Sequence, residues 1–401
     1  MAETRLRSDA CPGALTVHVA ADGGLARVRL PGGLITAAAL RVLATAASDL
    51  GDGELELTSR GNIQLRGLAP GAEFDLGERI AAVGLLPSPS HERVRNIVAS
   101  PLAGIDRPDI PSTGQTTELA ELAQELDRKL CAEPMLAELP GRFLFGLDDG
   151  RGDILALEPD LTAFASTPGR FQIWQPHADR GCEVPVEGVT DTLVAGALMF
   201  LQERKATNSK AWRISELPDS ARHVTDRLIA EFGASPAAGT RGPLFAGVPA
   251  GTAEPAGIVE QPDGRSALVV LAPLGRLSGQ QVHFLASKAG SRGLRITPWR
   301  SVVVPDLVDV GSVAQAAAEF GLGVDTDSPW YHISTCAGRP GCAKALADVR
   351  ADAIAELERS GTPQYTVRWS GCERQCGRPR HTAVHLIATG NGYRRMENGI
   401  S

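Results

Sequence analysis

The chain has 401 residues with a net charge of −7, 43% hydrophobic residues and only 4% aromatic ones. This length suits two or three domains, and the negative charge argues against nucleic acid or an anionic membrane as a partner. The N-terminal stretch MAETRLRSDACPG lacks an apolar core, and no apolar run is long enough to span a bilayer. We therefore expect a cytoplasmic protein. Its seven cysteines, four of them in one motif, suit a reducing compartment better than a disulfide scaffold.

Two segments share one layout of strand, turn, helix and strand: 27–68 and 267–307. In each, a glycine-containing turn leads to a residue that can cap a helix, Thr36 or Ser278, and apolar residues then recur at helical spacing. Each segment ends in a threonine-containing stretch, ELELTSRGNIQL or LRITPWRSVVV, that we interpret as a strand. The long separation of the two copies predicts a duplication with two homologous halves.

The first of these stretches has a polar face. With the two-residue period of a strand, its apolar residues point to one side, and the other side carries Arg60, Asn62, Gln64 and Arg66. Arginine pairs bidentately with carboxylates and stays charged, so this row predicts a site for an anionic, planar ligand. A solvated outer strand face is the alternative interpretation.

Four cysteines near the C-terminus are spaced C-x5-C and C-x3-C and have glycine or proline neighbours: Cys336, Cys342, Cys372 and Cys376. All-cysteine ligation of this kind is what a [4Fe–4S] cluster needs. Structural zinc sites usually use tighter C-x2-C pairs, so zinc is a weaker alternative. Unligated core thiols are a third interpretation.

The cysteine spacing resembles the cluster motif of the sulfite and nitrite reductase superfamily. The resemblance implies an α+β fold with an internal duplication, in which two ferredoxin-like half-domains pair and two larger α/β domains accompany them. It also implies that Cys376 would bridge the cluster to sirohaem iron if that cofactor is present. The implied domains, with a glycine- and proline-rich linker at 233–257, are 14–80 and 245–308 for the half-domains, 88–240 for the first α/β domain, and 309–401 for the cluster-bearing one.

The resemblance also assigns residues to a tetrapyrrole. Thr58, Arg60 and Gln64 match the superfamily's T-x-R-x-x-x-Q element, while RVRLPGG and RVRNIVASPLAG match strands that carry anion-contacting arginines. LPGRFLF (139–145) is similar to an LP-x-K-F-K element. The implied tetrapyrrole-binding residues are Arg27, Arg29, Arg60, Asn62, Gln64, Arg66, Arg95 and Arg142.

One position departs from the reductases. Where they carry a second lysine, this chain has Leu144, which can neither donate a proton nor bind an oxyanion. The chain is more similar to the precorrin-3B synthases of aerobic cobalamin biosynthesis, through Cys11-Pro12-Gly13, ITPWR (296–300) and HLIATGNGYRR (385–395). Those enzymes belong to the same superfamily.

This resemblance implies a monooxygenase that converts precorrin-3A to precorrin-3B, by C20 hydroxylation and γ-lactone formation, with dioxygen and an external electron donor. It implies a second iron besides the cluster, mononuclear and non-haem. Candidate ligands are His332, His381 and His385, each of which is also compatible with an ordinary strand or surface histidine. We expect a monomer, and the sequence names no catalytic acid or base. The alternatives are a sirohaem-dependent sulfite or nitrite reductase and a non-catalytic iron–sulfur electron carrier or sensor.

Overall fold

A computed structural model describes residues 9, 11–106, 110–111, 116–117, 119–176, 181–217, 220–232, 256–377 and 382–397. The chain divides into two compact units, which are described separately. Unit 1 comprises 1–14, 28–34 and 84–253, and unit 2 comprises 15–27, 35–83 and 254–401. Most of the predicted linker at 233–257 lies outside the described residues.

Unit 2 contains one five-stranded sheet from each repeat. The first has the order β1 (His18–Ala20), β2 (Gly23–Val28), β5 (Ile63–Leu68), β4 (Glu54–Leu57), β15 (Arg276–Ser278). The second has the order β13 (Gly257–Glu260), β14 (Ser266–Leu271), β17 (Ser301–Leu307), β16 (Leu294–Ile296), β3 (Leu34–Ile35). Each sheet thus ends in a short strand from the other repeat, and in one of these exchanges Leu277 pairs with Leu55.

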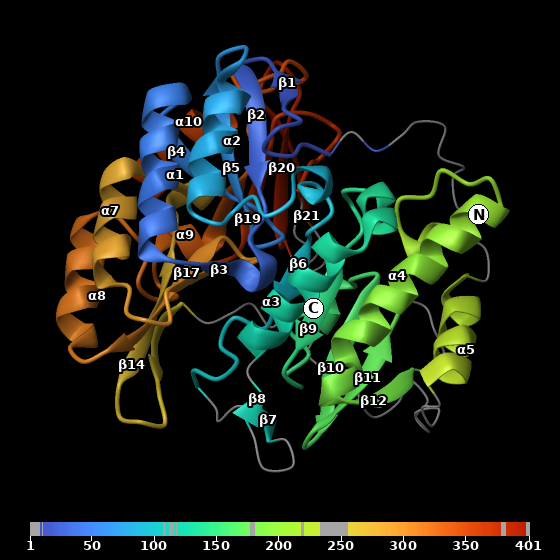
Figure 1. Cartoon of the computed structure of the whole chain (residues 1–401). Coiled ribbons are helices and arrows are strands. Elements are labelled where there is room, and N and C mark those ends of the chain that lie inside the picture. The colour runs from blue at the N-terminus through green and yellow to red at the C-terminus, as the bar shows by residue number, and fades with distance from the viewer. Residues whose placement is uncertain are drawn as a thin grey trace. The chain divides into compact units, whose positions relative to one another are not determined.

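The helices of the two repeats also correspond. Helices α1 (Ala37–Leu50) and α7 (Gly279–Lys288) pack side by side, as Figure 1 shows, and α2 (Ala72–Ala82) and α8 (Val310–Glu319) follow them in their repeats. The predicted caps are confirmed. The Thr36 hydroxyl accepts the amide of Ala39 at 3.2 Å. Ser278 accepts the amide of Gln281 at 3.3 Å, and the Gln281 side chain accepts the Ser278 amide in return, which completes a capping box.

The threonine-containing stretches are hairpins, so the prediction of one strand in each was wrong. β4 and β5 flank a turn at 58–62, and β16 and β17 flank a turn at 297–300. Thr58 Oγ1 accepts the amide of Asn62 at 3.1 Å, and Thr297 Oγ1 accepts the amide of Ser301 at 3.3 Å. A threonine hydroxyl can thus satisfy amides that a continuous strand would pair elsewhere, although threonine itself favours strands.

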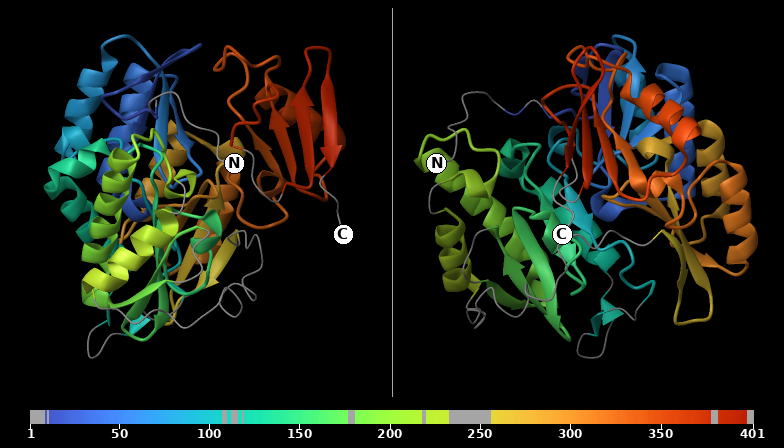
Figure 2. Two further views of the ribbon diagram at one scale, coloured as in Figure 1. Left: turned by 90° about the vertical axis from the view of Figure 1, so that its right-hand side faces the viewer. Right: turned by 180° about the vertical axis from the view of Figure 1, so that it is seen from behind.

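A four-stranded sheet completes unit 2 and carries the cysteine motif. Its order is β18 (Ile333–Thr335), β19 (Val367–Ser370), β20 (Val384–Ala388), β21 (Tyr393–Glu397), and the first three strands are parallel. Helix α10 (Val349–Ser360) packs against β18 and β19, and the short α9 (Pro329–His332) precedes β18. Figure 2 shows these strands in red beside the orange α10.

Unit 1 is built on another five-stranded sheet. Its order is β12 (Cys182–Pro185), β11 (Arg170–Trp174), β10 (Leu161–Thr167), β9 (Phe145–Asp148), β6 (Ile97–Ala99). The helices are α3 (Leu119–Ala132), α4 (Val189–Ala206) and α5 (Ser220–Phe232). Strands β7 (Ile110–Pro111) and β8 (Thr116–Thr117) form a separate antiparallel pair. Helix α4 packs on β10 and α3, and the rings of Phe143, Phe145 and Phe200 lie in this core, tilted against one another.

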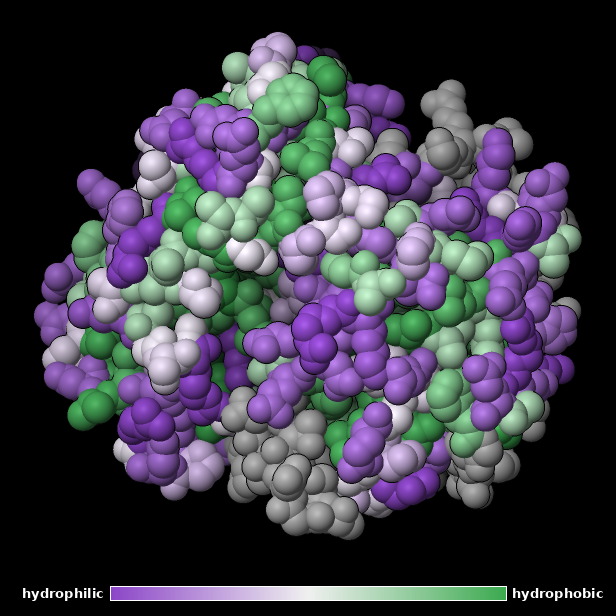
Figure 3. Space-filling view, in the orientation of Figure 1, coloured by the Kyte–Doolittle hydropathy of each residue, from purple (hydrophilic) through white to green (hydrophobic). Residues whose placement is uncertain are grey.

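Hydrophilic residues dominate the face of the molecule shown in Figure 3, with hydrophobic ones scattered among them. The most exposed large hydrophobic side chains among the described residues, Val308, Val19 and Phe74, come from separate parts of the chain. Of the helices in the described part, none is long and apolar enough to cross a membrane.

Candidate metal centre

The parallel pairing of β18 and β19 places two of the four cysteines at adjacent strand ends. Cys336 directly follows β18, and Cys372 lies two residues beyond β19. The amide of Cys336 donates to the carbonyl of Trp369 at 3.1 Å, and the amide of Gly371 donates to Cys336 Sγ at 3.2 Å. An amide aimed at sulfur stabilises a thiolate, which is the form of cysteine that binds metal.

Buried arginines hold the main chain beside three of the cysteines. Arg368 on β19 donates to the carbonyls of Thr335 and Cys376, both at 2.6 Å. Arg66 on β5 donates to the carbonyl of Gly341, the neighbour of Cys342, also at 2.6 Å. Because Arg368 and Arg66 are only 1% and 4% exposed, these contacts lie in the interior and fix the loops around the motif.

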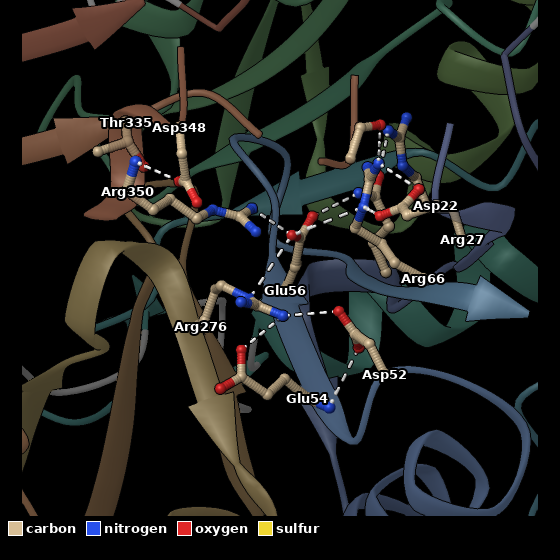
Figure 4. A network of polar contacts seen from close by, with 12 residues as sticks. Asp22, Arg27, Asp52, Glu54, Glu56, Arg66, Arg276, Thr335, Asp348 and Arg350 are labelled. Atoms are coloured by element: carbon tan, nitrogen blue, oxygen red, sulfur yellow. Dashed lines mark hydrogen bonds and ion pairs between the residues drawn. The ribbon is translucent and has the colours of Figure 1, made fainter. Parts of the chain in front are cut away.

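Arg66 and Arg276 also have acidic partners, in a polar network that Figure 4 shows. Arg66 makes a bidentate pair with Asp22, with both distances at 2.9 Å. Arg276 pairs with Asp52 at 2.6 Å and with Glu54 at 2.5 Å. Each of these two guanidinium groups is therefore balanced by at least one carboxylate.

The centre of the network is Glu56 on β4, which is buried (Figure 4). Arg350, near the start of α10, pairs with its Oε1, and Gln64 donates to its Oε2 at 2.7 Å. Both oxygens of this carboxylate are thus engaged. The contacts join the β4–β5 hairpin to the helix that follows the first cysteine pair.

Two further arginines, Arg300 and Arg368, have no carboxylate partner within the described residues. Burial lowers the pKa of Arg368 and nearby Arg300 lowers it too, while Cys336 and Cys376 oppose the shift, which leaves a pKa of about 9. Positive charge that faces cysteines, without an acid to balance it, suits an anionic group at the motif. A [4Fe–4S] cluster on four thiolates carries net negative charge, so the residues present fit that group.

The predicted tetrapyrrole residues of unit 2 do not form one strand face. Arg60 lies on the turn and Asn62 precedes β5, so only Gln64 and Arg66 alternate along a strand. Arg27 donates to Gln64 Oε1 at 2.9 Å, which brings these two together. The role of these residues toward a tetrapyrrole stays a prediction.

Three other predicted residues lie in unit 1. Arg29 is 2% exposed and donates to the carbonyls of Arg93 and Pro12, both at 3.2 Å. Arg95 makes a bidentate pair with Asp127 at 2.6 and 2.7 Å. The exposed Arg142 lies over the Trp212 ring, 5.1 Å from its centroid. Their predicted ligand role also stays a prediction, and Arg29 and Arg95 clearly support the local fold.

Leu144, where the resemblance implies a lysine in the reductases, lies in the core of unit 1. Its side chain is 4% exposed. Its amide donates to Asp160 Oδ2 at 2.9 Å, and the Asp160 amide donates to the Leu144 carbonyl at 2.8 Å. This position therefore carries no polar side chain.

The structure does not gather the candidate histidines into a second iron site. His385 Nε2 lies 2.8 Å from the Ser370 hydroxyl, and His332 Nε2 lies 3.1 Å from the Thr326 carbonyl, while His381 is outside the described residues. Among the residues that the structure describes, the one group of three metal-ligating side chains within 4.8 Å of one another contains no histidine. The second iron stays a prediction without assigned ligands.

That group consists of Asp148, Asp149 and Asp153 in unit 1, and sequence reasoning missed it. Burial and, to a smaller extent, the charge of Asp148 together raise the pKa of Asp153 to about 7. Asp153 accepts the Ser100 hydroxyl at 2.6 Å. Asp148 accepts four main-chain amides at 2.9–3.0 Å and so organises the loop after β9; the donors are Gly150, Gly152, Ile154 and Leu155.

Comparison with known proteins gives the same fold and the same relatives. Residues 18–83 match the family described as the nitrite/sulfite reductase ferredoxin-like half domain. The chain is 28% identical to a precorrin-3B synthase of Sinorhizobium sp, over 99% of this chain and 84% of that protein. It is 25% identical to a ferredoxin–nitrite reductase of Synechococcus elongatus, over 90% and 76% of the two chains.

A sulfite reductase [ferredoxin] of Mycolicibacterium paratuberculosis is 28% identical over 88% of this chain and 67% of its own length. The solved structure of the NirA protein of Mycobacterium tuberculosis superposes with a TM-score of 0.69 at 19% identity, over 93% of this chain and 73% of that one. These findings confirm the predicted α+β fold class and the predicted resemblance to the superfamily.

Proposed function

We propose that this chain, which has the fold of the sulfite and nitrite reductases, is an oxygen-dependent oxidoreductase that converts precorrin-3A to precorrin-3B. The observation that carries the proposal is similarity to a precorrin-3B synthase over 99% of the chain and 84% of that relative. Leu144 supports it, because the reductases' proton-donating lysine is replaced here by a buried apolar side chain.

In the proposed reaction one atom of dioxygen enters the macrocycle at C20 as a hydroxyl group. The other leaves as water after taking up two electrons and two protons from an external donor and solvent. The carboxyl oxygen of a peripheral acetate adds to the neighbouring unsaturated ring carbon, whose π bond breaks as the γ-lactone closes. The proton of that carboxyl group stays on the macrocycle, so no second water is lost.

The residues of this chain divide these tasks. Cys336, Cys342, Cys372 and Cys376 would hold a [4Fe–4S] cluster, which when bound supplies single electrons. Arg27 and Arg60 would bind substrate carboxylates as charged hydrogen-bond donors, with Gln64 positioned between Arg27 and Glu56. Gly371 would stabilise the Cys336 thiolate through its amide.

The first test is purification without oxygen, followed by an optical spectrum and by iron, sulfide and haem analysis. Broad cluster absorption with acid-labile sulfide and no sirohaem is expected. Stoichiometric sirohaem, with its sharp Soret and α bands, would instead assign the protein to the sulfite or nitrite reductases. The second test is a single turnover of precorrin-3A under ¹⁸O₂, in which the product should gain one labelled oxygen by mass spectrometry.

Substrate binding can be tested separately with Arg60→Ala. This variant should bind a carboxylate-rich tetrapyrrole at least about tenfold more weakly, because a charged hydrogen bond is lost. Its cluster absorption should be unchanged. Arg265→Ala, which removes an exposed arginine paired with Asp263, is the matched control. Equal affinity of both variants would show that the Arg60 turn is merely solvated.

A further inference from the structure

The duplicated turns of unit 2 differ at one position in an informative way. In the first repeat the turn runs from Thr58 through Gly61, and in the second it runs from Thr297 through Arg300. The amide of Gly61 donates to the Thr58 carbonyl at 3.1 Å, and the amide of Arg300 donates to the Thr297 carbonyl at 3.2 Å. The turns are therefore equivalent, residue by residue.

Both Gly61 and Arg300 have a φ of 63°. This left-handed conformation costs glycine nothing, but it strains a residue with a Cβ atom. The first repeat thus has the residue that the backbone favours, and the second keeps a long charged one despite the strain. Strain of this kind persists mainly where the side chain has a function.

The Arg300 side chain reaches the loop of the fourth cysteine. Its stem passes over Gly275, where a Cβ atom would lie 2.6 Å from Arg300 Cδ. A Cβ atom on Gly377, next to Cys376, would lie 3.4 Å from Arg300 Nη2 and 3.2 Å from Arg368 Nη2. Two guanidinium groups therefore meet at the main chain beside Cys376.

Arg300 has no partner among the described residues that would explain this placement. Within the described residues its guanidinium group makes no hydrogen bond and no ion pair. Glu56 is the acid whose charge raises the pKa of Arg300, but its two oxygens are already engaged by Arg350 and Gln64. Arg300 is only half-buried, so a ligand can reach it.

Arg368, rather than Arg300, is the arginine that holds the cysteine loops. Arg368 donates to the carbonyls of Thr335 and Cys376, whereas the guanidinium group of Arg300 makes no hydrogen bond or ion pair within the described residues. Arg300 lies beside Arg368, with its donors open to an anion.

We propose that Arg300 is a substrate-binding residue that receives a carboxylate of the tetrapyrrole on the Cys376 side of the site. The assignment rests on the proposed function and adds a residue from the second repeat to the predicted set, all of which precedes that repeat. A guanidinium fork matches a carboxylate in a bidentate pair, and an acetate or propionate side chain supplies one.

The test is fluorescence titration with sirohydrochlorin, a metal-free reduced tetrapyrrole that carries acetate and propionate groups. Arg300→Gly copies the turn of the first repeat, so the variant should fold with a melting temperature no lower than that of the unaltered protein. It should bind the probe at least about tenfold more weakly, since a charged hydrogen bond is lost. Arg300→Lys should recover part of the affinity, and Arg265→Ala should bind as the unaltered protein does.

The reduction potential of the cluster in Arg300→Gly is the second measurement, and it should stay unchanged. Full affinity in Arg300→Gly would overturn the assignment, and full affinity with a shifted potential would show that Arg300 balances cluster charge instead. If the unaltered protein does not bind sirohydrochlorin, the proposed function fails as well. If the unaltered protein binds sirohydrochlorin and the Arg300 variants bind it as tightly as Arg265→Ala does, this inference is wrong while the proposed function stands.

Discussion

At the scale of single residues, the buried arginines beside the cysteines differ in whether they have an acidic partner. Arg66 combines a pair to Asp22 with a hydrogen bond to the Gly341 carbonyl, so it holds a loop in place. Arg368 holds two main-chain carbonyls but lacks an acid among the described residues, so it also leaves a positive charge at the cysteines. The same residue type thus fixes loop geometry in one case and adds an electrostatic field in the other.

Arg66→Ala should therefore loosen the loop that carries Cys342 without removing a ligand. We expect less iron and sulfide per chain after purification, and a loss of about 2 kcal/mol of unfolding free energy, because Asp22 and the Gly341 carbonyl lose their donor. Iron and sulfide analysis checks the first effect, and urea unfolding checks the second. Arg79→Ala, which breaks an exposed pair with Asp75, should change neither quantity measurably. Full cluster content in Arg66→Ala would contradict a positioning role.

Asp153 makes the stability of unit 1 depend on pH. Its pKa is about 7 in the folded chain, against an ordinary 3.8, because it is buried beside Asp148 and Asp149. Between these values the folded state keeps a proton that the unfolded state has lost, so this stabilisation disappears as the pH rises through about 7. A difference of this size corresponds to about 4 kcal/mol at most.

Asp153→Asn should flatten this dependence, because the amide stays neutral at every pH while it can still accept the Ser100 hydroxyl. The measurement is urea unfolding at about pH 5, 6, 7 and 8, a range that includes the loss of the Asp153 proton in the folded chain. Asp263→Asn, at an exposed carboxylate whose pKa is lowered by Arg265, is the control. Parallel pH profiles for Asp153→Asn and the unaltered protein would rule out Asp153 as the source.

At the scale of elements, the sequence predicted the N-termini of helices α1 and α7 most accurately. Thr36 and Ser278 were identifiable because a short polar residue before a run of helical periodicity has one favourable use, to accept a free amide of the first turn. The threonine turns were missed for the opposite reason. Thr58 and Thr297 fit a strand by propensity, and only their hydrogen bonds reveal a turn.

Ser278→Ala should lower the unfolding free energy by about 1 kcal/mol, because it removes one half of a capping box. Hydrogen exchange of the first α7 amides should accelerate by a factor of about five, the equivalent of that free energy. Ser287→Ala in the same helix removes a hydroxyl that contacts only the Phe284 carbonyl and serves as the control. Equal exchange rates in the two variants would mean that the cap contributes nothing.

Across the whole molecule, the duplication and the cysteine motif were readable from the sequence because each depends on spacing, and the fold class followed from the family resemblance that the motif carries. The network around Glu56 was not, because it joins the β4–β5 hairpin to β15 and α10, which lie more distant in the chain. Arg368 gave no signal either, since within VRWS it looks like any strand residue. Contacts over such separations are fixed by tertiary packing rather than by local pattern.

Loss of the metal should affect one part of unit 2 and spare another. Without an anionic cluster, the positive charge of Arg368 beside Cys336 and Cys376 would lose its counter-charge, so we expect the loops at 336–346 and 371–377 to loosen. Chelation of iron, followed by hydrogen exchange and mass spectrometry, should show faster exchange in these loops. Strands β14 and β17 should keep their protection. Uniform acceleration throughout unit 2 would instead show that the cluster supports the entire unit.

The exchanged edge strands have a consequence for synthesis on the ribosome. Strand β4 pairs with β15 on one side, yet β15 follows it by roughly 200 residues, which translation takes some tens of seconds at most to cover. Throughout that interval β4 is an open edge that a neighbouring nascent chain could join. Glu54 and Glu56 lie on this edge, and their like charges repel a second copy of the strand until Arg276 arrives with β15 to pair with both. Before Glu54 and Glu56 organise the polar network, their charges would thus hinder aggregation of nascent chains.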